Sequence, residues 1–388
     1  MQRKKTFSVR ALTLLLALSL MFGLTACNTD DKNQPTKETT AKVTKQAAEE
    51  NEPEKTEAAH TEAEKTETES NEEAETTEPE AKTDAKLQKV TFSLDWTPNT
   101  NHTGLYVARN LGYYADEGIE IDIQQPAEDG AETLVAAGHA QFGISFQDFT
   151  SNAWAKEEPM PITAVAAIIN HNTSGIVSLK EKGIESPGKL AGHNYASWET
   201  PTEIAIMKNI VEADNGKWED VEVVPYTITD AVSGLQTNVD SLWIYYAWDG
   251  IAIEQADLDT NYLDISKLNP VFDYYSPIII ANDKFLEEQP DLAKAFMRAT
   301  AKGYNYAIEH PDEAAKILCD AVPELDPELV KASQEWLKDQ YQSDAPYWGY
   351  IDAERWNKFY AWLWDEKLIE YEIPADFGFT NDLVKPEA

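Results

Sequence analysis

The sequence predicts an α/β protein whose folded part consists of two lobes. Short runs with strand-like alternation are separated by helical runs over residues 89–146, and the same order returns over residues 162–249. Strands that alternate with helices are typical of a parallel sheet with crossover helices. From residue 283 onward the pattern is mostly helical. We therefore expect two α/β lobes, with charged C-terminal helices wrapped around the first lobe.

The first residues have the pattern of an export signal. Basic residues among the first ten precede an apolar run over residues 11–24, which is the order found in a secretory signal. About fourteen apolar residues are too few for a helix that spans a bilayer. Residues 1–26 are therefore predicted to be a signal peptide.

The apolar run ends at Leu24-Thr25-Ala26-Cys27. Small residues followed by a cysteine at the expected cleavage point resemble the lipobox of bacterial lipoproteins, in which the cysteine is diacylated. Cys27 is thus predicted to anchor the chain to the outer face of the cell membrane, and a plain secretory signal with a bystander cysteine is the alternative. The chain has two cysteines, Cys27 and Cys319. If Cys27 is acylated, Cys319 has no disulfide partner within the chain.

Residues 27–87 have the composition of a disordered acidic linker. Glu, Thr, Lys, Ala and Asn dominate this segment, so it cannot bury enough apolar surface to offset the entropy of ordering. A flexible chain of roughly sixty residues gives the folded part a reach on the order of 40 Å. That reach is enough to dock over a permease in the same membrane.

The net charge of −37 is carried mostly by the part that follows the linker. Such a surface argues against nucleic acid or an anionic membrane surface as the ligand. It does not reveal the charge of a small solute, because that depends on the groups around the binding site.

The first block alternates three strands with two helices. Gly112 and Gly138 follow the two helices, as C-terminal glycines often do, and Asp148 is placed to cap a further helix after the third strand. The expected elements are strand 89–94, helix 103–110, strand 118–123, helix 131–137 and strand 142–146.

The second block has a distinct helix start. Thr200 is expected as the N-cap, Pro201 in the first turn and Glu203 as the capping-box residue. The expected strands are 162–169, 175–179, 221–225, 240–249 and 278–280. The strand 240–249 leads into an aromatic cluster. The expected helices are 204–210, 231–235, 283–288, 290–309, 311–321, 327–339 and 352–366.

A turn-forming segment near residues 186–188 sets the predicted lobe boundary. Lobe 1 is expected to comprise residues 88–186 and 277–388, and lobe 2 residues 187–276. Ligands of such sheets bind outside the carboxyl ends of the strands. The polar segments at those ends are therefore the expected binding loops, together with the helix N-terminus near residue 201 and its free N–H groups.

The segment from Leu94 to Ala108, which reads LDWTPNTNHTGLYVA, resembles the opening of the ThiY-like group of substrate-binding proteins. Residues 137–145 and 238–243 are similar to further signatures of the superfamily, which includes sulfonate and nitrate receptors. The resemblance implies a type II periplasmic-binding-protein fold, with two lobes around a ligand cleft, that works with an ABC permease and its ATPase. ThiY-like members bind an aminopyrimidine precursor of thiamin, such as a formylaminopyrimidine or hydroxymethylpyrimidine, and a neighbouring class binds riboflavin.

Eukaryotic relatives of this group synthesise the thiamin pyrimidine, and the sequence departs from them. They carry a Lys just after the tryptophan, which holds pyridoxal phosphate, and a cysteine-rich metal motif. Here Thr97 stands in place of the Lys, although His102 matches the histidine of that motif. Six histidines without metal-ligand spacing do not indicate a metal site. A pyrimidine-synthase-like enzyme is therefore the disfavoured alternative, and we expect no catalytic residue and no cofactor.

An aminopyrimidine needs aromatic faces for stacking and a carboxylate or amide for its polar edge. For several candidates a structural role is the alternative: the core for the tryptophans, a cap for Asp148, a turn for Asn99 and solvated surface for Glu199. The segments 95–102 and 194–203 contain no Arg or Lys, which disfavours a sulfonate or nitrate. The predicted ligand-binding residues are Asp95, Trp96, Asn99, His102, Gln147, Asp148, Trp198, Glu199, Thr202, Trp243, Tyr245 and Trp248.

Overall fold

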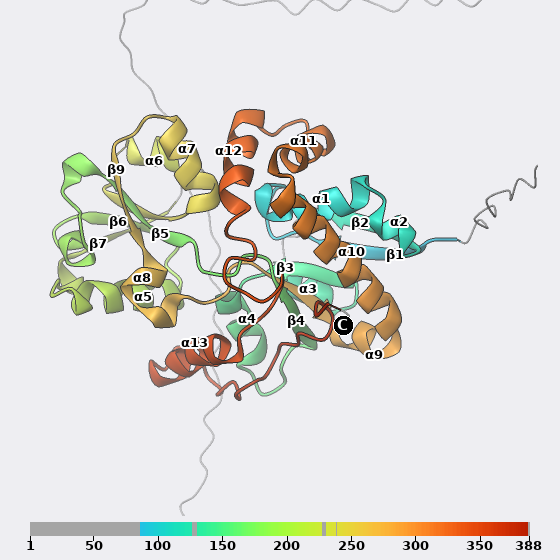
Figure 1. Cartoon of the computed structure of the whole chain (residues 1–388). Helices are drawn as coiled ribbons and strands as arrows, with labels where there is room; N and C mark the ends of the chain where they lie inside the picture. The colour runs from blue at the N-terminus through green and yellow to red at the C-terminus, as the bar shows by residue number, and fades with distance from the viewer. Residues whose placement is uncertain (1–85, 126–129, 227–229, 238, 387–388) are drawn as a thin grey trace, which may run out of the picture. The chain divides into compact units, whose positions relative to one another are not determined.

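A computed structural model describes residues 86–125, 130–226, 230–237 and 239–386. The predicted signal peptide, Cys27 and nearly all of the predicted linker lie outside the described residues. The described part contains two five-stranded sheets with helices around them (Figure 1).

The first sheet belongs to lobe 1 and has the strand order β2-β1-β3-β10-β4. β1 is parallel to β2 and β3, whereas β10 is antiparallel to both of its neighbours. Its strands are β1 (Gln88–Ser93), β2 (Ile119–Gln124), β3 (Phe142–Ser145), β4 (Ile162–Ala167) and β10 (Ile278–Asn282). The sheet is therefore mixed, although the local pattern predicted a parallel one.

The second sheet belongs to lobe 2 and has the order β7-β6-β8-β5-β9. β6 is parallel to β7 and β8, and β5 is antiparallel to β8 and β9. Its strands are β5 (Ser174–Leu179), β6 (Asn194–Ser197), β7 (Glu222–Pro225), β8 (Ser241–Tyr245) and β9 (Thr260–Asp264).

The position of β5 corrects the predicted lobe boundary. β5 pairs along its length with β8 and β9, so the chain enters lobe 2 over residues 168–173 rather than at residue 187. It returns to lobe 1 over residues 273–277, close to the expected end at residue 276. The boundary was set too late because a buried apolar strand does not reveal in its own sequence which sheet it joins.

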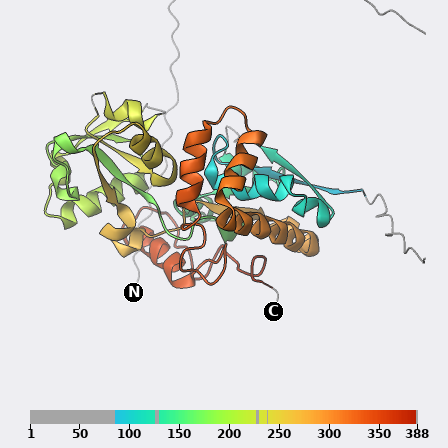
Figure 2. The same cartoon turned by 45° about the horizontal axis from the view of Figure 1, so that its top comes forward.

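Two helices of lobe 1, α1 and α10, pack against each other through a glycine contact. A Cβ on Gly303 would lie 2.1 Å from the Gly104 carbonyl oxygen, and one on Gly104 would overlap the Tyr304 ring. α1 and α10 therefore approach backbone to backbone, and both views show them side by side (Figures 1 and 2). The early helices are η1 (Thr100–His102), α1 (Thr103–Asn110), α2 (Tyr113–Asp116), α3 (Gly130–Ala136) and α4 (Gln147–Trp154).

Lobe 2 and the segments that join it to lobe 1 contain several short helices and one longer helix. The longest, α5, starts as predicted, with the Thr200 hydroxyl accepting from the Glu203 N–H. The elements are η2 (Lys180–Lys182), η3 (Pro187–Leu190), α5 (Pro201–Ala213), η4 (Trp218–Asp220), α6 (Ala231–Leu235), the π-helix η5 (Tyr246–Gly250), α7 (Ile251–Gln255), α8 (Ile265–Leu268) and η6 (Pro270–Phe272).

The C-terminal helices contact both lobes. α10 and α11 pack on α1, but Trp336 of α12 lies 5.2 Å from the Tyr246 ring of lobe 2. Phe359 of α13 stacks at 4.3 Å on Tyr274 of the return crossover. These helices are α9 (Asp283–Glu288), α10 (Pro290–Glu309), α11 (Pro311–Ala321), α12 (Pro327–Leu337) and α13 (Ala353–Asp365). Within the described ranges, none is both long and apolar enough to cross a membrane.

Candidate functional site

The polar loop after β1 is held in one conformation by its own side chains. Asn99 accepts a bond from the Asn101 N–H at 2.9 Å, and the Asn99 N–H donates to His102 Nδ1 at 3.1 Å. Because Nδ1 accepts, the ring proton sits on Nε2, which donates to Asp95 Oδ1 at 2.8 Å. The His102 side chain is fully buried. His102 thus acts on the site through the orientation of the Asp95 carboxylate.

Buried hydroxyl groups fix the same loop to the C-terminal helices. The Tyr341 hydroxyl donates to the Thr100 carbonyl at 2.6 Å, and that of Tyr304 donates to the Asn101 carbonyl at 2.7 Å. Ser333 of α12 contacts the Thr100 hydroxyl at 2.6 Å and also donates to the Ala247 carbonyl of lobe 2. Side-chain hydrogen bonds therefore fasten the loop to the C-terminal helices.

The side chain of Gln147, the first residue of α4, makes hydrogen bonds to the backbone of two other segments. Its Nε2 donates to the Trp356 carbonyl and its Oε1 accepts from the Tyr275 N–H, both at 2.9 Å. Its own N–H donates to the Tyr275 carbonyl at 3.0 Å. The amide fastens α4 to the return crossover, which is a structural role.

Asp148 is the second residue of α4 and not its cap. The N-cap position is taken by Phe146, which has no capping side chain. Among the described residues, no group makes a hydrogen bond to the buried Asp148 Oδ1. Burial raises the pKa of Asp148 to about 7, with a smaller contribution from Glu132, although the N–H groups of Asp148 and Phe149 oppose the shift.

Aromatic side chains of lobe 2 gather at the ends of β6 and β8. Trp198 follows β6, and its ring lies 6.1 Å from that of Trp243 and 5.7 Å from that of Tyr226. Trp243 and Tyr245 are two residues apart on β8 and so share one face. Trp198 is 43% exposed and Trp243 only 4%.

Tyr245 is one of the points where the two lobes meet. Its ring centroid lies 6.1 Å from that of Phe146 in lobe 1. Burial raises the pKa of Tyr245 far above its ordinary value, and the charges of Asp148 and Asp95 add to the effect. The Ser276 side chain of the return crossover also lies beside this phenol. The structure therefore brings predicted residues of both lobes together around Tyr245.

Three buried polar atoms of the described residues lack a hydrogen-bond partner, and their residues include two of the predicted ligand-binding residues. In the part of the chain that the structure describes, Asp148 Oδ1, Trp243 Nε1 and Ser276 Oγ have no hydrogen-bond partner. We call these three the unpaired atoms. Leaving a buried polar group unpaired costs about 1–3 kcal/mol, so each needs an explanation. A ligand that accepts from Trp243 and donates to Asp148 would satisfy two of them, while the third, Ser276 Oγ, lies beside the Tyr245 phenol.

The other predicted residues are exposed, half-buried in α5, or packed into another apolar cluster. Trp96 is 62% exposed. Glu199 is also exposed and has a left-handed backbone with φ 58°. Thr202 is half-buried in the first turn of α5. Trp248 packs against an apolar cluster of α11 and α12 that includes Leu318.

Two carboxyl groups of lobe 2 were not predicted as site residues. Glu203 is buried and accepts from the Tyr195 hydroxyl at 2.6 Å and from the Trp198 N–H at 3.2 Å; burial raises its pKa. Burial also raises the pKa of Asp249 to about 6, and Asp249 accepts from the Tyr245 N–H at 3.2 Å. Glu203 positions Trp198 and Asp249 positions Tyr245. The capping-box spacing pointed to Glu203, whereas no sequence signal pointed to Asp249.

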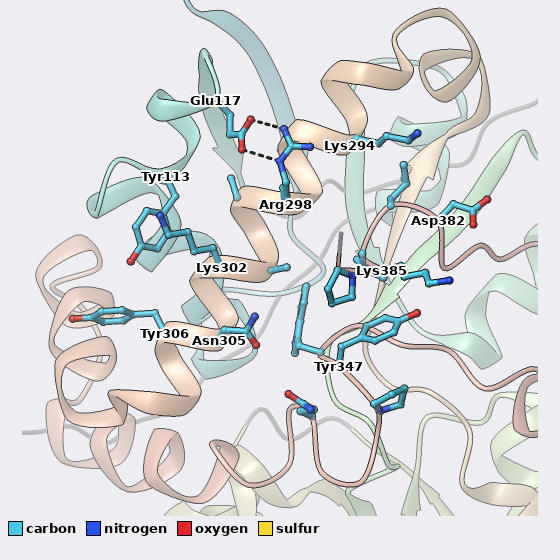
Figure 3. Close-up of a pocket in the computed structure, with 18 of the residues that line it drawn as sticks. Tyr113, Glu117, Lys294, Arg298, Lys302, Asn305, Tyr306, Tyr347, Asp382 and Lys385 are labelled. Carbon is cyan, nitrogen blue, oxygen red and sulfur yellow. Dashed lines mark hydrogen bonds and ion pairs between the residues drawn. The ribbon is translucent and has the colours of Figure 1, made fainter. Parts of the chain in front are cut away.

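A pocket of about 850 Å³ lies elsewhere, against α10 in lobe 1 (Figure 3). Lys302 lies 3.9 Å above the Tyr113 ring, and Arg298 makes a two-pronged ion pair with Glu117. Its walls carry both acidic and basic groups, and the predicted ligand residues are not part of its lining. Across the described chain, no group of three His, Cys, Asp or Glu residues is arranged to hold a metal ion.

Relatives of known function include a binding protein and a synthase. The formylaminopyrimidine-binding protein of Halalkalibacterium halodurans is 30% identical over 312 residues, which cover 78% of this chain and 92% of that protein. The 4-amino-5-hydroxymethyl-2-methylpyrimidine phosphate synthase of Legionella pneumophila is 28% identical over 241 residues, 61% of this chain and 75% of the synthase.

A solved structure confirms the predicted fold class. The alkanesulfonate-binding protein SsuA from Xanthomonas axonopodis pv. citri, bound to MOPS, superposes with a TM-score of 0.58 at 11% identity. The match covers 76% of this chain and 99% of that protein. The family model described as NMT1/THI5 like matches residues 99–314, which is more than half of the chain. The chain therefore belongs to the NMT1/THI5-like family.

Proposed function

We propose that this protein is the extracytoplasmic solute-binding component of an ABC importer and that it captures an aminopyrimidine precursor of thiamin. The observation that carries the proposal is the set of unpaired atoms beside aromatic rings. One edge of an aminopyrimidine presents an amino donor next to a ring-nitrogen acceptor. Asp148 Oδ1 accepts from the amino group and Trp243 Nε1 donates to the ring nitrogen, while the exposed Trp198 ring offers a stacking face.

Family membership and the name of the formylaminopyrimidine-binding relative support this ligand class. A solute-binding protein of this kind delivers its ligand to a permease driven by an ATPase. Lipidation at Cys27 would hold the protein at the outer face of the cell membrane, and the linker would let it reach the permease.

The synthase relative makes an enzyme the second candidate function. We propose that this chain is not such an enzyme, because Thr97 stands where the eukaryotic enzymes hold a Lys for pyridoxal phosphate. Incubation with pyridoxal phosphate distinguishes the two functions. A Schiff base would give a visible absorbance change, whereas a binding protein leaves the cofactor spectrum unchanged.

Calorimetric titration tests the ligand. An aminopyrimidine should bind tightly, and taurine, a sulfonate, should not. Trp243→Phe keeps a ring but removes the Nε1 donor, so affinity for the aminopyrimidine should fall by about 1–3 kcal/mol. Trp364→Phe, at an exposed tryptophan of α13, is the matched control and should change nothing.

Riboflavin is the alternative ligand, since its larger ring also suits a site lined by tryptophan and tyrosine. Tighter binding of riboflavin than of any aminopyrimidine would establish that alternative. Tight taurine binding, or full affinity in Trp243→Phe, would overturn the site assignment itself.

A further inference from the structure

His171 lies where the chain crosses from lobe 1 into lobe 2. It belongs to the crossover of residues 168–173, between β4 and β5. Its Nδ1 lies 2.7 Å from Asp273 Oδ2, on the return crossover. Its Nε2 lies 3.0 Å from Asp344 Oδ1, in the segment between α12 and α13 of lobe 1. One imidazole thus joins both crossovers to the C-terminal part of lobe 1.

The geometry requires the charged form of the ring. An ionised carboxylate only accepts hydrogen bonds, so each of the two ring nitrogens must carry a proton to bond Asp273 and Asp344 at once. A neutral imidazole has one N–H and keeps only one of these bonds. Loss of the ring proton therefore removes a contact at the lobe crossing.

The charged groups around His171 are Asp273, Asp344 and Arg355. Arg355 of α13 donates to the Asn170 carbonyl, and its guanidinium lies 3.7 Å from Asp273 Oδ2. The hydrogen bond to Asp273 is the main cause that raises the pKa of His171; burial and Arg355 oppose it, and Asp344 adds to it.

The two carboxylates are not equivalent partners. Asp273 is largely buried and its Oδ1 also accepts from the Asn172 N–H at 2.9 Å. The Asp344 side chain is 77% exposed. When the ring loses a proton, the shorter and better shielded bond to Asp273 is the one retained, and the bond to Asp344 is lost.

We propose that His171 is a pH-sensitive lock on the lobe crossing. In its charged form it adds a second bond from the first crossover to Asp344, beside the one that Asn170 Nδ2 donates at 2.7 Å. In its neutral form only the Asn170 bond to Asp344 remains, and the crossover is freer to bend. The consequence for ligand capture rests on the proposed function, because lobe closure is what retains a solute. The lock itself is a property of the ligand-free protein.

The direction of the effect follows from the raised pKa. A histidine favoured in its charged form contributes its full stabilisation below its ordinary pKa of about 6.5. That contribution is lost as pH rises through the raised value. The lock is therefore closed in mild acid and released toward alkaline pH.

Two measurements on the ligand-free protein test the lock. In an NMR titration of the imidazole signals, with His171→Gln used for assignment, His171 should titrate above the ordinary histidine value. Asp344→Asn should lower that pKa. Hydrogen exchange, corrected for the intrinsic exchange rates, measures the protection of the backbone amides of residues 168–174. This protection should fall about two- to five-fold as pH rises through the pKa of His171, which is the range expected for one exposed ion pair.

The variants separate the lock from a general loss of structure. Asp344→Asn changes an exposed side chain and should give low, pH-independent protection of the crossover, while the rest of the protein stays protected. His193→Gln, at a lobe 2 histidine that lies 3.5 Å from Asp240, should leave the profile unchanged. A His171 pKa at or below the ordinary value, or a wild-type profile in Asp344→Asn, would overturn the proposal whatever ligand the protein binds.

Discussion

The unpaired Asp148 oxygen predicts that one substitution will stabilise the protein and weaken its binding. Asp148→Asn keeps the shape of the side chain but removes its charge. The wild-type carboxyl is buried, and its pKa is raised to about 7. Above that pH the ligand-free protein holds an ionised carboxylate away from water, which the variant avoids.

The magnitude follows from the two pKa values of the carboxyl group. An aspartate has a pKa of about 3.9 in an unfolded chain, so the shift is roughly three units and corresponds to about 4 kcal/mol. Between pH 4 and 7 the folded wild-type protein binds more protons than the unfolded chain, so its stability falls as pH rises. The variant lacks this group, and its advantage should therefore grow by about 1.4 kcal/mol per pH unit until pH 7 and then stay constant.

Urea unfolding of both proteins at a series of pH values measures this difference. Asp291→Asn is the matched control, because Asp291 is also the second residue of a helix but is exposed. The control should show no comparable pH-dependent gain. An Asp148→Asn advantage that does not change between pH 4 and 7 would show that the carboxyl is not buried without a partner, and the site argument would fail with it.

The same substitution should act in the opposite direction on binding. An amide at position 148 is a weaker acceptor than a carboxylate, so affinity for the aminopyrimidine should fall by about 1.5–3 kcal/mol. In the wild type, affinity should rise with pH until about pH 7, because binding to the ionised form first requires loss of the carboxyl proton. Calorimetry in buffers of different ionisation enthalpy would detect the released proton, and its absence would contradict the role of Asp148.

Three further substitutions test other parts of the structure. Gln147→Leu leaves the Tyr275 N–H without its acceptor, so urea unfolding should show a loss of about 1–3 kcal/mol; an unchanged stability would contradict the structural role. Trp198→Ala should weaken aminopyrimidine binding by at least 0.5–1.5 kcal/mol in calorimetry, and undiminished affinity would remove Trp198 from the site. Cys27→Ser should release the protein into the medium on cell fractionation, whereas retention and normal processing would refute the lipid anchor.

The local elements were predictable because their signals are local. The helices from Pro290 and Pro311 begin at the expected residues, since a proline in the first turn and an amphipathic repeat need no distant contact. Sheet order was not predictable in the same way. β10 inserts between β3 and β4 although more than a hundred residues separate it from both, and such pairing leaves no trace in the paired sequences.

The proposed site illustrates what the sequence can and cannot indicate. Asp95 and Asp148 follow strands of the first sheet and Trp198 follows a strand of the second, and each was expected because ligands bind outside the carboxyl ends of strands. Gln147 and Asp148 stand side by side in the sequence, yet the Gln147 amide is fully bonded within the fold and Asp148 keeps one oxygen, Oδ1, without a partner. Successive residues of a helix point about 100° apart, and only the surrounding chain decides which of the two directions leads into the fold.

The carboxyl groups around Tyr245 bear on which ligands the proposed site can accept. The SsuA structure holds a sulfonate buffer molecule, whereas the side chains around Tyr245 here include the carboxyl groups of Asp95, Asp148 and Asp249. An anion placed among them would lose its water without gaining a cation. A donor-bearing neutral heterocycle instead meets Asp148 Oδ1, an acceptor that is otherwise unsatisfied among the described residues. Because fold alone does not determine the ligand, we expect these three carboxyl groups, and not the two-lobed architecture, to exclude sulfonates. Replacing Asp148 and Asp249 together by Asn should therefore reduce the discrimination against taurine that calorimetry measures. Unchanged discrimination would refute this account.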